Sequence, residues 1–494
     1  MILNRHSAFL ALTLFLFSAT RLSAQENTVD TDQPVPDEVV VPVSEQDLEA
    51  SSDEAPVMDD EALMVAEFVR FKELVENGAY DEADTVAKRI IELAIKTKGA
   101  QSTDMAKALT NLAIVQHRTQ QYDAAVQNYQ SAIEIIEDAE DRLNEQLVNP
   151  LKGLAAAQLE NGRPDLASST YRRAVHVTHV NEGPHNLEQI DLLENLAEVH
   201  LRMGDLDAAK QVQDTIYAIN VRAYDVDSLE LVSALMRRAK WQHRAGFVYD
   251  ERATYRRAIR IIEEQQGQDS LALVEPLVLL GRSFFFPDTS GATSYQPSGL
   301  ASGEVYFKRA LRIAAESPDS TWKTVADATL ALGDYYMYGN NPQRARQVYR
   351  GAWDLLSETA GQEDKLAVRR SELEETVILK QLPLPQFVGE TNPVGVQDAD
   401  NPVLQGTVTM SYGISTRGRV KDLKLIETEP PEFTGMQQLV LRELRRRIFR
   451  PRFENGDPVD TPAQVLVHTF YYRQSDLDQR REAAAAVADE EEDS

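Results

Sequence analysis

The chain has 494 residues, a formal net charge of −28 and no cysteine. A chain of this length can form several domains with sizeable buried cores. Its excess of acidic residues argues against a nucleic-acid partner, because phosphate binding needs a basic surface. The lack of cysteine excludes disulfides, thiolate nucleophiles and cysteine-ligated zinc sites.

Residues 1–24 have the form of a secretory signal peptide. A weakly basic start, Asn4–His6, is followed by the apolar run Ala8–Phe17 and by small residues that favour cleavage after Ala24. The apolar run is shorter than the roughly 20 residues that a membrane-spanning helix needs. We therefore predict cleavage and export, with an uncleaved N-terminal anchor as the alternative.

The segment 25–60 is predicted to be a disordered acidic linker. From Glu26 to Asp60 it has no Lys or Arg, no aromatic residue and no helical periodicity. Such a segment cannot bury enough apolar surface to offset the entropy of the chain. A solvated spacer is the simpler interpretation, and a partner-binding segment is the alternative.

Residues 61–380 repeat a unit of two amphipathic helices with a period of 42 residues. In the unit Ala108–Glu137 the two helices meet at a tight turn near Gln120 and Gln121. An insertion, residues 287–302, lengthens one unit by ten residues and forms a loop that contains Tyr295. The period predicts a helical solenoid of about seven helix pairs. Its markers are the turn glycines Gly78, Gly162, Gly204 and Gly246 and the helix alanines Ala132, Ala174, Ala258, Ala310 and Ala352.

This unit resembles the tetratricopeptide repeat, in the long form found in kinesin light chains. The matching elements are the Tyr-Asp-x-Ala run Tyr122–Ala125, the TNLA run Thr110–Ala113 and the GPH run Gly183–His185. The resemblance implies a concave face that is lined by the first helix of each pair and binds extended peptides. It implies backbone contacts from Asn111 and Asn195, which share one repeat position. Arg237, one repeat further on, is a further candidate for peptide binding by its position alone. A solvated or helix-bonding side chain is the alternative for each.

No catalytic motif is evident. His176 and His179 share a helix face and His185 follows them, but no Asp or Glu completes a ligand set with metal-binding spacing. There is no phosphate-binding Gly-rich loop, nucleophile elbow or HExxH helix. We predict a protein that is not an enzyme and has no cofactor or metal. An envelope enzyme with its site in the solenoid groove is the least favoured alternative.

The period changes after a Pro- and Gly-rich linker, residues 381–402, which we expect to dock in part through Phe387. Residues 403–473 then read as strand, strand, helix and strand, a small α+β domain. Alternation in Gly406–Ile414 and in Val420–Glu427 marks the first two strands. A helix over Gly435–Ile448 and a last strand over Ala463–Tyr472 complete the domain.

These elements resemble the TonB C-terminal domain through four segments in order: Gly406–Ser415, Gly418–Glu427, Leu439–Pro451 and Phe453–Tyr472. The resemblance implies a periplasmic domain whose last strand adds a short segment of an outer-membrane transporter to its edge. The family's usual membrane anchor and its Tyr-Pro element are not evident, so binding without energy transduction is expected. The implied edge residues are Val465, Leu466, Val467, His468, Thr469, Phe470 and Tyr471.

A basic cluster stands out in this acidic chain. It contains Arg442, Arg445, Arg446, Arg447, Arg450 and Arg452. The cluster is either a solvated helix face or a docking site for an anionic partner surface or for the acidic end Ala488–Ser494 of a tail, residues 474–494, that we expect to be disordered.

Together these features predict a periplasmic protein–protein interaction scaffold. The solenoid groove would bind one protein or peptide partner, and the TonB-like domain would bind an envelope or outer-membrane partner by strand addition. The alternative is a TonB-type energy transducer for outer-membrane transport, anchored in the inner membrane and facing the periplasm.

Overall fold

The computed structural model describes residues 59–285, 303–357, 363–388 and 401–492. The chain divides into two compact units, and the boundary lies between Val226 and Asp227. We call residues 59–226 the N-terminal unit and the described residues from 227 onward the C-terminal unit. The predicted signal peptide, nearly all of the acidic linker and the insertion loop with Tyr295 lie outside the described residues.

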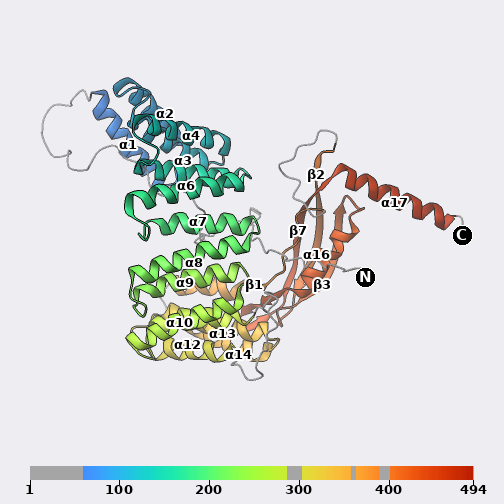
Figure 1. The fold of residues 1–494 in the computed structure, drawn as a ribbon. Coiled ribbons are helices and arrows are strands. Elements are labelled where there is room, and N and C mark those ends of the chain that lie inside the picture. Colours follow the sequence, from blue (N-terminus) through green and yellow to red (C-terminus); the bar gives the residue numbers. More distant parts are fainter. Residues whose placement is uncertain (1–58, 286–302, 358–362, 389–400, 493–494) are drawn as a thin grey trace, which may run out of the picture. The chain divides into compact units, whose positions relative to one another are not determined.

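The N-terminal unit consists of four helix pairs in sequence order (Figure 1). Each helix packs on the next one along the chain, so the pairs stack as a solenoid. A 3₁₀ turn over Glu145–Leu147 precedes the fifth helix. The helices are α1 (Asp60–Glu76), α2 (Tyr80–Thr97), α3 (Thr103–Arg118), α4 (Tyr122–Ala139), α5 (Val148–Glu160), α6 (Pro164–Glu182), α7 (Gln189–Arg202) and α8 (Leu206–Ala223).

The C-terminal unit continues with three further helix pairs in its described residues. They are α9 (Glu230–Arg244), α10 (Val248–Gln266), α11 (Val274–Ser283), α12 (Glu304–Glu316), α13 (Trp322–Tyr338) and α14 (Pro342–Ser357). A short helix α15 (Glu363–Arg369) and a π-helical turn over Arg370–Glu374 follow the last pair. The predicted helical solenoid is therefore confirmed.

The turn inside each pair explains the glycine spacing. Gly78, Gly162, Gly204 and Gly246 have φ between 70° and 78°, the left-handed region that favours glycine. At the equivalent position two further pairs have Gln120, with φ of 63°, and Asn340, with φ of 57°. The turn between α11 and α12 lies outside the described residues. The same backbone turn therefore recurs even where glycine is replaced, at some cost in strain.

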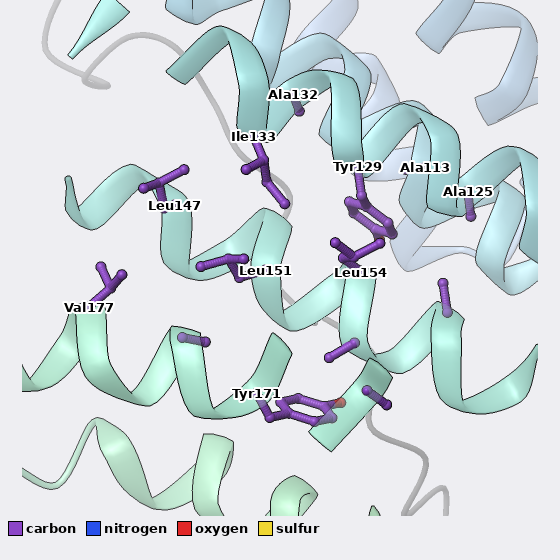
Figure 2. Close-up of a cluster of buried hydrophobic side chains, with 14 of the residues drawn as sticks. Ala113, Ala125, Tyr129, Ala132, Ile133, Leu147, Leu151, Leu154, Tyr171 and Val177 are labelled. Carbon is purple, nitrogen blue, oxygen red and sulfur yellow. The ribbon is translucent and has the colours of Figure 1, made fainter. Parts of the chain in front are cut away.

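A large aromatic ring fills the core of most pairs. Tyr129, Tyr171, Tyr255, Phe307 and Tyr349 occupy the same repeat position and are almost completely buried. Figure 2 shows Tyr129 of α4 directed at the stretch of α5 that ends in Leu154. The ring fits because α5 has a glycine there: a Cβ on residue 153 would lie 2.3 Å from the Tyr129 ring. Small residues thus allow neighbouring helices to approach across a bulky side chain.

The C-terminal β region comprises a three-stranded antiparallel sheet with the strand order β3-β2-β7. The helix α16 (Thr434–Arg446) covers one face of this sheet, where Val408, Met410, Phe470 and Val440 form part of a buried core. The strands of this sheet are β2 (Val403–Ile414), β3 (Val420–Glu429) and β7 (Thr461–Arg473). The predicted order of strand, strand, helix and strand therefore describes the main sheet.

Two small additions to this region were not predicted. The strand β1 (Val377–Lys380) pairs with β4 (Ile448–Arg450), although we had assigned residues 377–380 to the solenoid. The strands β5 (Arg452–Glu454) and β6 (Asp457–Val459) form a hairpin around the turn at Asn455 and Gly456.

The expectation of a disordered tail is wrong over residues 474–492, which form the helix α17 (Gln474–Glu492). Leu477 is buried in the core of the β region, and the Asp476 carboxylate accepts a hydrogen bond of 2.9 Å from the Arg473 backbone N–H. An ion pair of 2.7 Å joins Arg481 to Glu432. These contacts anchor the first turns of the helix. They could not be predicted from the residue pattern of this short acidic segment.

Throughout the part of the chain that the structure describes, no helix is both long enough and apolar enough to cross a bilayer.

Candidate functional site

The strand β7 lies at an edge of the three-stranded sheet. It pairs with β2 from Val403↔Arg473 to Ile414↔Thr461, with one shift of register near Tyr412. Among the described residues, only an isolated bridge between Phe387 and Tyr471 lies on its other side. Most of the outer side of β7 is therefore available to a further strand.

The outward-facing backbone groups of β7 can be assigned from that bridge. The Tyr471 N–H donates to the Gln386 carbonyl at 2.7 Å, and the Tyr471 carbonyl accepts from the Val388 N–H at 2.9 Å. Because backbone groups alternate sides along a strand, the N–H and C=O of Val465, Val467 and Thr469 also face outward. Ala463 lies in the register shift between Gln464 and Thr461.

We call this run of β7, residues 463–469, the open edge. In the open edge, the residues whose backbone groups face away from β2 carry their side chains on the face of the sheet opposite to α16. Val465 is 61% exposed and Val467 is 50% exposed. The neighbouring Leu466 and His468 point to the other face and are partly buried. Exposed β-branched side chains beside unpaired backbone groups are suited to pairing with another strand.

The other edge of the sheet has a different character. Its strand β3 has two shifts of register against β2 and a left-handed residue, Asp422, with φ of 51°. It also carries Lys421, Lys424, Glu427 and Glu429, whereas β7 has no charged residue from Thr461 to Tyr472. Charges and irregular pairing are the usual protection against a further strand. From Gln464 to Tyr472 the β7 edge has neither charged residues nor irregular pairing.

A short segment, Leu384–Val388, closes the C-terminal end of the open edge; we call it the strap. Phe387 stacks on Tyr471 with ring centroids 5.9 Å apart. The His468 ring nitrogen Nε2 lies 3.0 Å from the Pro385 carbonyl oxygen. Burial lowers the pKa of His468, and the hydrogen bond to Pro385 opposes this shift. The predicted docking of the linker through Phe387 is therefore observed.

The β region also contacts the last repeat of the solenoid, through Arg450 of β4. The Arg450 guanidinium donates two hydrogen bonds to the carboxylate of Asp334 in α13, at 2.9 and 2.8 Å, and one of 2.6 Å to Glu372. The Tyr349 hydroxyl of α14 donates to the same Asp334 carboxylate at 2.7 Å. Arg450 and Asp334 are both buried, so each charge depends on the other.

The electrostatics of this cluster follow from burial and pairing. Burial disfavours the charged form of Arg450, but Asp334, together with Tyr349 and Glu372, outweighs this effect and raises the pKa of the guanidinium. Burial, followed by the Asp334 charge, raises the pKa of the Tyr349 hydroxyl well above its usual value. Arg450 and Asp334 therefore stay charged and the Tyr349 hydroxyl stays neutral. Their hydrogen bonds connect the β region to α13 and α14.

The predicted basic cluster does not form a single surface. Arg447 is buried and bonded to Glu443 at 2.9 Å, and Arg450 is buried against Asp334. Arg452 is partly exposed and pairs with Glu454. Only Arg442, Arg445 and Arg446 remain exposed, on α16. The six arginines therefore form neither one solvated face nor one docking site, because two of them neutralise buried carboxylates.

The predicted groove residues differ in their exposure to solvent. Asn111 has no exposed surface, since α3 is covered by both α4 and α5, so it cannot contact a peptide without rearrangement. Asn195 is half-buried, and its Nδ2 has no hydrogen-bond partner among the described residues. Arg237 is exposed but belongs to the C-terminal unit. The peptide-binding roles of Asn195 and Arg237 stay predictions.

A cavity of about 390 Å³ lies elsewhere in the N-terminal unit, between α3, α5 and the end of α6. Its lining includes Lys107, Thr110, Asn149, Thr178 and Glu188, and none of the three predicted groove residues. Within the described residues, no group of His, Asp and Glu side chains is arranged to hold a metal ion.

Sequence reasoning missed Asp334, Tyr349 and Glu372 as partners of the β region. One signal was present for Asp334, which is a lone acid in the otherwise uncharged stretch Ala328–Tyr338. A buried acid requires a partner, but nothing in the sequence points to Arg450 as that partner.

The tetratricopeptide repeat family matches residues 74–138 and 104–178 of the chain. No curated protein matches the chain in sequence. Solved structures with a similar fold include one from Podosopora anserina. It contains nearly identical TPR-like repeats of a kinesin light chain. That structure is 14% identical, covers 42% of this chain and 99% of its own, and has a TM-score of 0.38.

BtubC (BKLC) from P. vanneervenii is 17% identical, with 42% and 84% of the two chains covered and a TM-score of 0.36. A tetratricopeptide repeat protein from Parabacteroides merdae is 16% identical, with 62% and 96% covered and a TM-score of 0.33. Residues 74–178 therefore contain tetratricopeptide repeats.

Proposed function

We propose that this protein is a non-enzymatic interaction scaffold of the periplasm. In this proposal the solenoid binds one protein partner, and the β region binds an extended segment of an envelope or outer-membrane protein along the open edge of β7. The observation that carries the proposal is the contrast between the two edges of the sheet. From Gln464 to Thr469 the open edge is uncharged, keeps one register with β2 and has no further strand beside it among the described residues, whereas β3 is charged and irregular.

Two features support a TonB-like role for the β region. The order of its main elements, with a helix over one face and the last strand at an edge, is the order that the sequence resemblance implies. Val465 and Val467 at the open edge expose half of their surface or more, which is unusual for apolar side chains in a chain rich in polar residues. Strand addition would bury these side chains and pair the backbone groups beside them.

The repeats support the second half of the proposal. Tetratricopeptide-type solenoids are built from stacked helix pairs that leave long surfaces for protein partners. The structure adds a direct physical link between the last repeat and the β region, the buried pair of Arg450 and Asp334. A partner bound at the β region would therefore be held next to the end of the solenoid within the C-terminal unit.

Binding at the open edge can be tested with a random library of nine-residue peptides displayed on phage and selected against the full chain. We expect selected peptides to bind at least tenfold more weakly to a Val465→Lys/Val467→Lys variant, because charges block strand addition. The matched control is Leu425→Lys/Ile426→Lys on β3, where the side chains are 42% and 55% exposed. Equal loss in both variants would reject the β7 edge as the site.

A second variant tests the backbone itself. Val467→Pro removes an outward N–H donor, whereas Val467→Thr keeps it together with a β-branched side chain. We expect the proline variant to lose the selected peptides and the threonine variant to retain them. Retained binding by a folded proline variant would rule out ladder pairing at this residue.

The anchored energy transducer is the alternative function, and it differs from the scaffold in its N-terminus. N-terminal sequencing of the protein purified from the envelope of its host separates the two. A mature chain that begins at Gln25 or Glu26 supports the scaffold. A chain that retains residues 1–24 supports an inner-membrane anchor.

A further inference from the structure

Nothing in the open edge itself selects one register for a partner strand. Its outward-facing residues are β-branched and uncharged: Val465, Val467 and Thr469. A slip of two residues would return every partner side chain to the same face of the sheet. A uniform edge of this kind therefore needs another feature to fix where an added strand begins or ends.

The strap provides such a feature at Tyr471, the next outward-facing residue after Thr469. It already uses both the N–H and the C=O of Tyr471, in hydrogen bonds of 2.7 and 2.9 Å. The strap therefore occupies the place that the next residue of a partner strand would take.

The strap is anchored on both sides of this bridge. Leu384 and Val388 pack against the buried core of the β region. Just before the strap, the Leu382 N–H donates to the Glu443 carboxylate at 3.2 Å, and Glu443 is itself held by Arg447. These contacts fix the strap to α16 as well as to β7.

Displacing the strap would bring a partner little benefit. A partner residue at Tyr471 would replace two backbone hydrogen bonds with two equivalent ones, so pairing would not increase there. The stacking of Phe387 on Tyr471 and the burial of Leu384 and Val388 would be lost. Pairing with the open edge alone requires none of these losses.

We propose that the strap is a fixed stop that sets the length and register of the strand added at β7. The partner is then an extended protein segment of about seven residues, the length of the open edge. It carries apolar or β-branched side chains beside Val465 and Val467. At the end next to Thr469, the segment either stops or turns away from the sheet. A turn-forming residue such as glycine, proline or asparagine therefore adjoins the segment at that end, on its N- or C-terminal side according to the strand direction. This inference rests on the proposed function.

The test uses the full chain and the peptide most enriched in the display selection, synthesised with seven residues. A spin label on each end of this peptide identifies the end that lies next to Thr469. A second version has four more residues at that end. We expect the two versions to bind wild-type protein with affinities within twofold. We expect the longer one to bind at least fivefold tighter to a Phe387→Ala/Val388→Pro variant, in which the strap no longer stacks or donates.

Amide hydrogen exchange in the same samples reports where pairing occurs. The seven-residue peptide should protect the N–H groups of Val465, Val467 and Thr469 and leave the protection of Val388 unchanged. A longer peptide that binds wild-type protein more than fivefold tighter, with loss of Val388 protection, would overturn the stop but keep the proposed function. No added protection at Val465 and Val467 would overturn both.

An engineered crosslink covers the case in which the strap variant does not fold. Because the chain has no cysteine, Phe387→Cys/Tyr471→Cys creates a single pair across the bridge. If the strap stays in place during binding, the seven-residue peptide should bind the oxidised and reduced forms within twofold. A tenfold or larger loss on oxidation would show that the strap must move, and would overturn the proposal.

Discussion

Tyr129 and Tyr349 occupy the same repeat position in the two units, and both are completely buried. The Tyr129 hydroxyl has no hydrogen-bond partner among the described residues, whereas the Tyr349 hydroxyl donates to Asp334. The repeat thus uses the ring as a space-filling group in both places. Only next to the β region does the polar end of the ring join a network, which also contains Arg450.

The largest expected effect is the loss of this network. Arg450→Ala leaves the Asp334 carboxylate buried and unpaired, which should cost about 3–5 kcal/mol of unfolding free energy. Amide exchange should show the loss in α13, α14 and β4. The control is Arg346→Ala, which breaks an ion pair of 2.8 Å with Asp457 between two exposed side chains. That change should cost at most about 1 kcal/mol. Equal effects would mean that Asp334 is solvated once Arg450 is gone.

The shared packing of the two units predicts a second, smaller effect. Ala132 and Ala352 are equivalent and fully buried, so Ala132→Leu and Ala352→Leu should each overpack a helix interface and cost about 1–3 kcal/mol. The measurement is urea unfolding, with amide exchange used to locate the loss in α4 or in α14. Replacement of the exposed Gly351 by alanine is the control, because no atom lies near its missing Cβ. A neutral result at either alanine would contradict a common repeat core.

Removing each hydroxyl tests the comparison directly. Tyr349→Phe takes one donor from the buried Asp334 carboxylate and should cost about 1–3 kcal/mol. Tyr129→Phe removes a buried hydroxyl without a partner and should be neutral or slightly stabilising. Both rings keep their packing, so each variant is the control of the other. A similar cost for both would show that the Tyr129 hydroxyl has a partner in solution.

The helical part of the fold was predictable because its information is local. A period of 42 residues, small alanines and turn glycines recur in most units, so each repeat supports the assignment of the next. Even the turn at Gln120, which lacks glycine, was located by its neighbours. Asn111 was placed on the wrong surface, because repeat spacing identifies equivalent residues but not which neighbouring helix covers them.

The candidate site was predictable in part, for a related reason. Alternation identifies the strands and an uncharged run identifies the open edge, and both are local properties of β7. The Arg450 network joins residues 116 positions apart, and the bridge from Phe387 to Tyr471 joins two segments with no shared pattern. Long-range pairs of this kind depend on packing that a single sequence does not display.

A second difference between equivalent positions concerns the polar residues inside each pair. Gln116, Gln158 and Gln242 each bond to a side chain twelve residues later, at 2.7 to 2.8 Å. The fourth member of this series is His200, and the residue twelve positions after it is Val212, which offers no hydrogen bond. His200 is buried, and its Nδ1 has no hydrogen-bond partner among the described residues.

This position predicts the smallest effect, a dependence of stability on pH. Burial and then Arg172 lower the pKa of His200, and Asp205 opposes them. An unfolded histidine binds a proton near pH 6.5, so the unfolded chain gains protons first as the pH falls. Stability should therefore decrease below about pH 6.5, by at most about 1.4 kcal/mol per pH unit for one group. His200→Gln should reduce the dependence on pH of the unfolding free energy, measured by urea unfolding from pH 7.5 to 5.5. The exposed control His185→Gln should not, and equal slopes would show that His200 is already solvated.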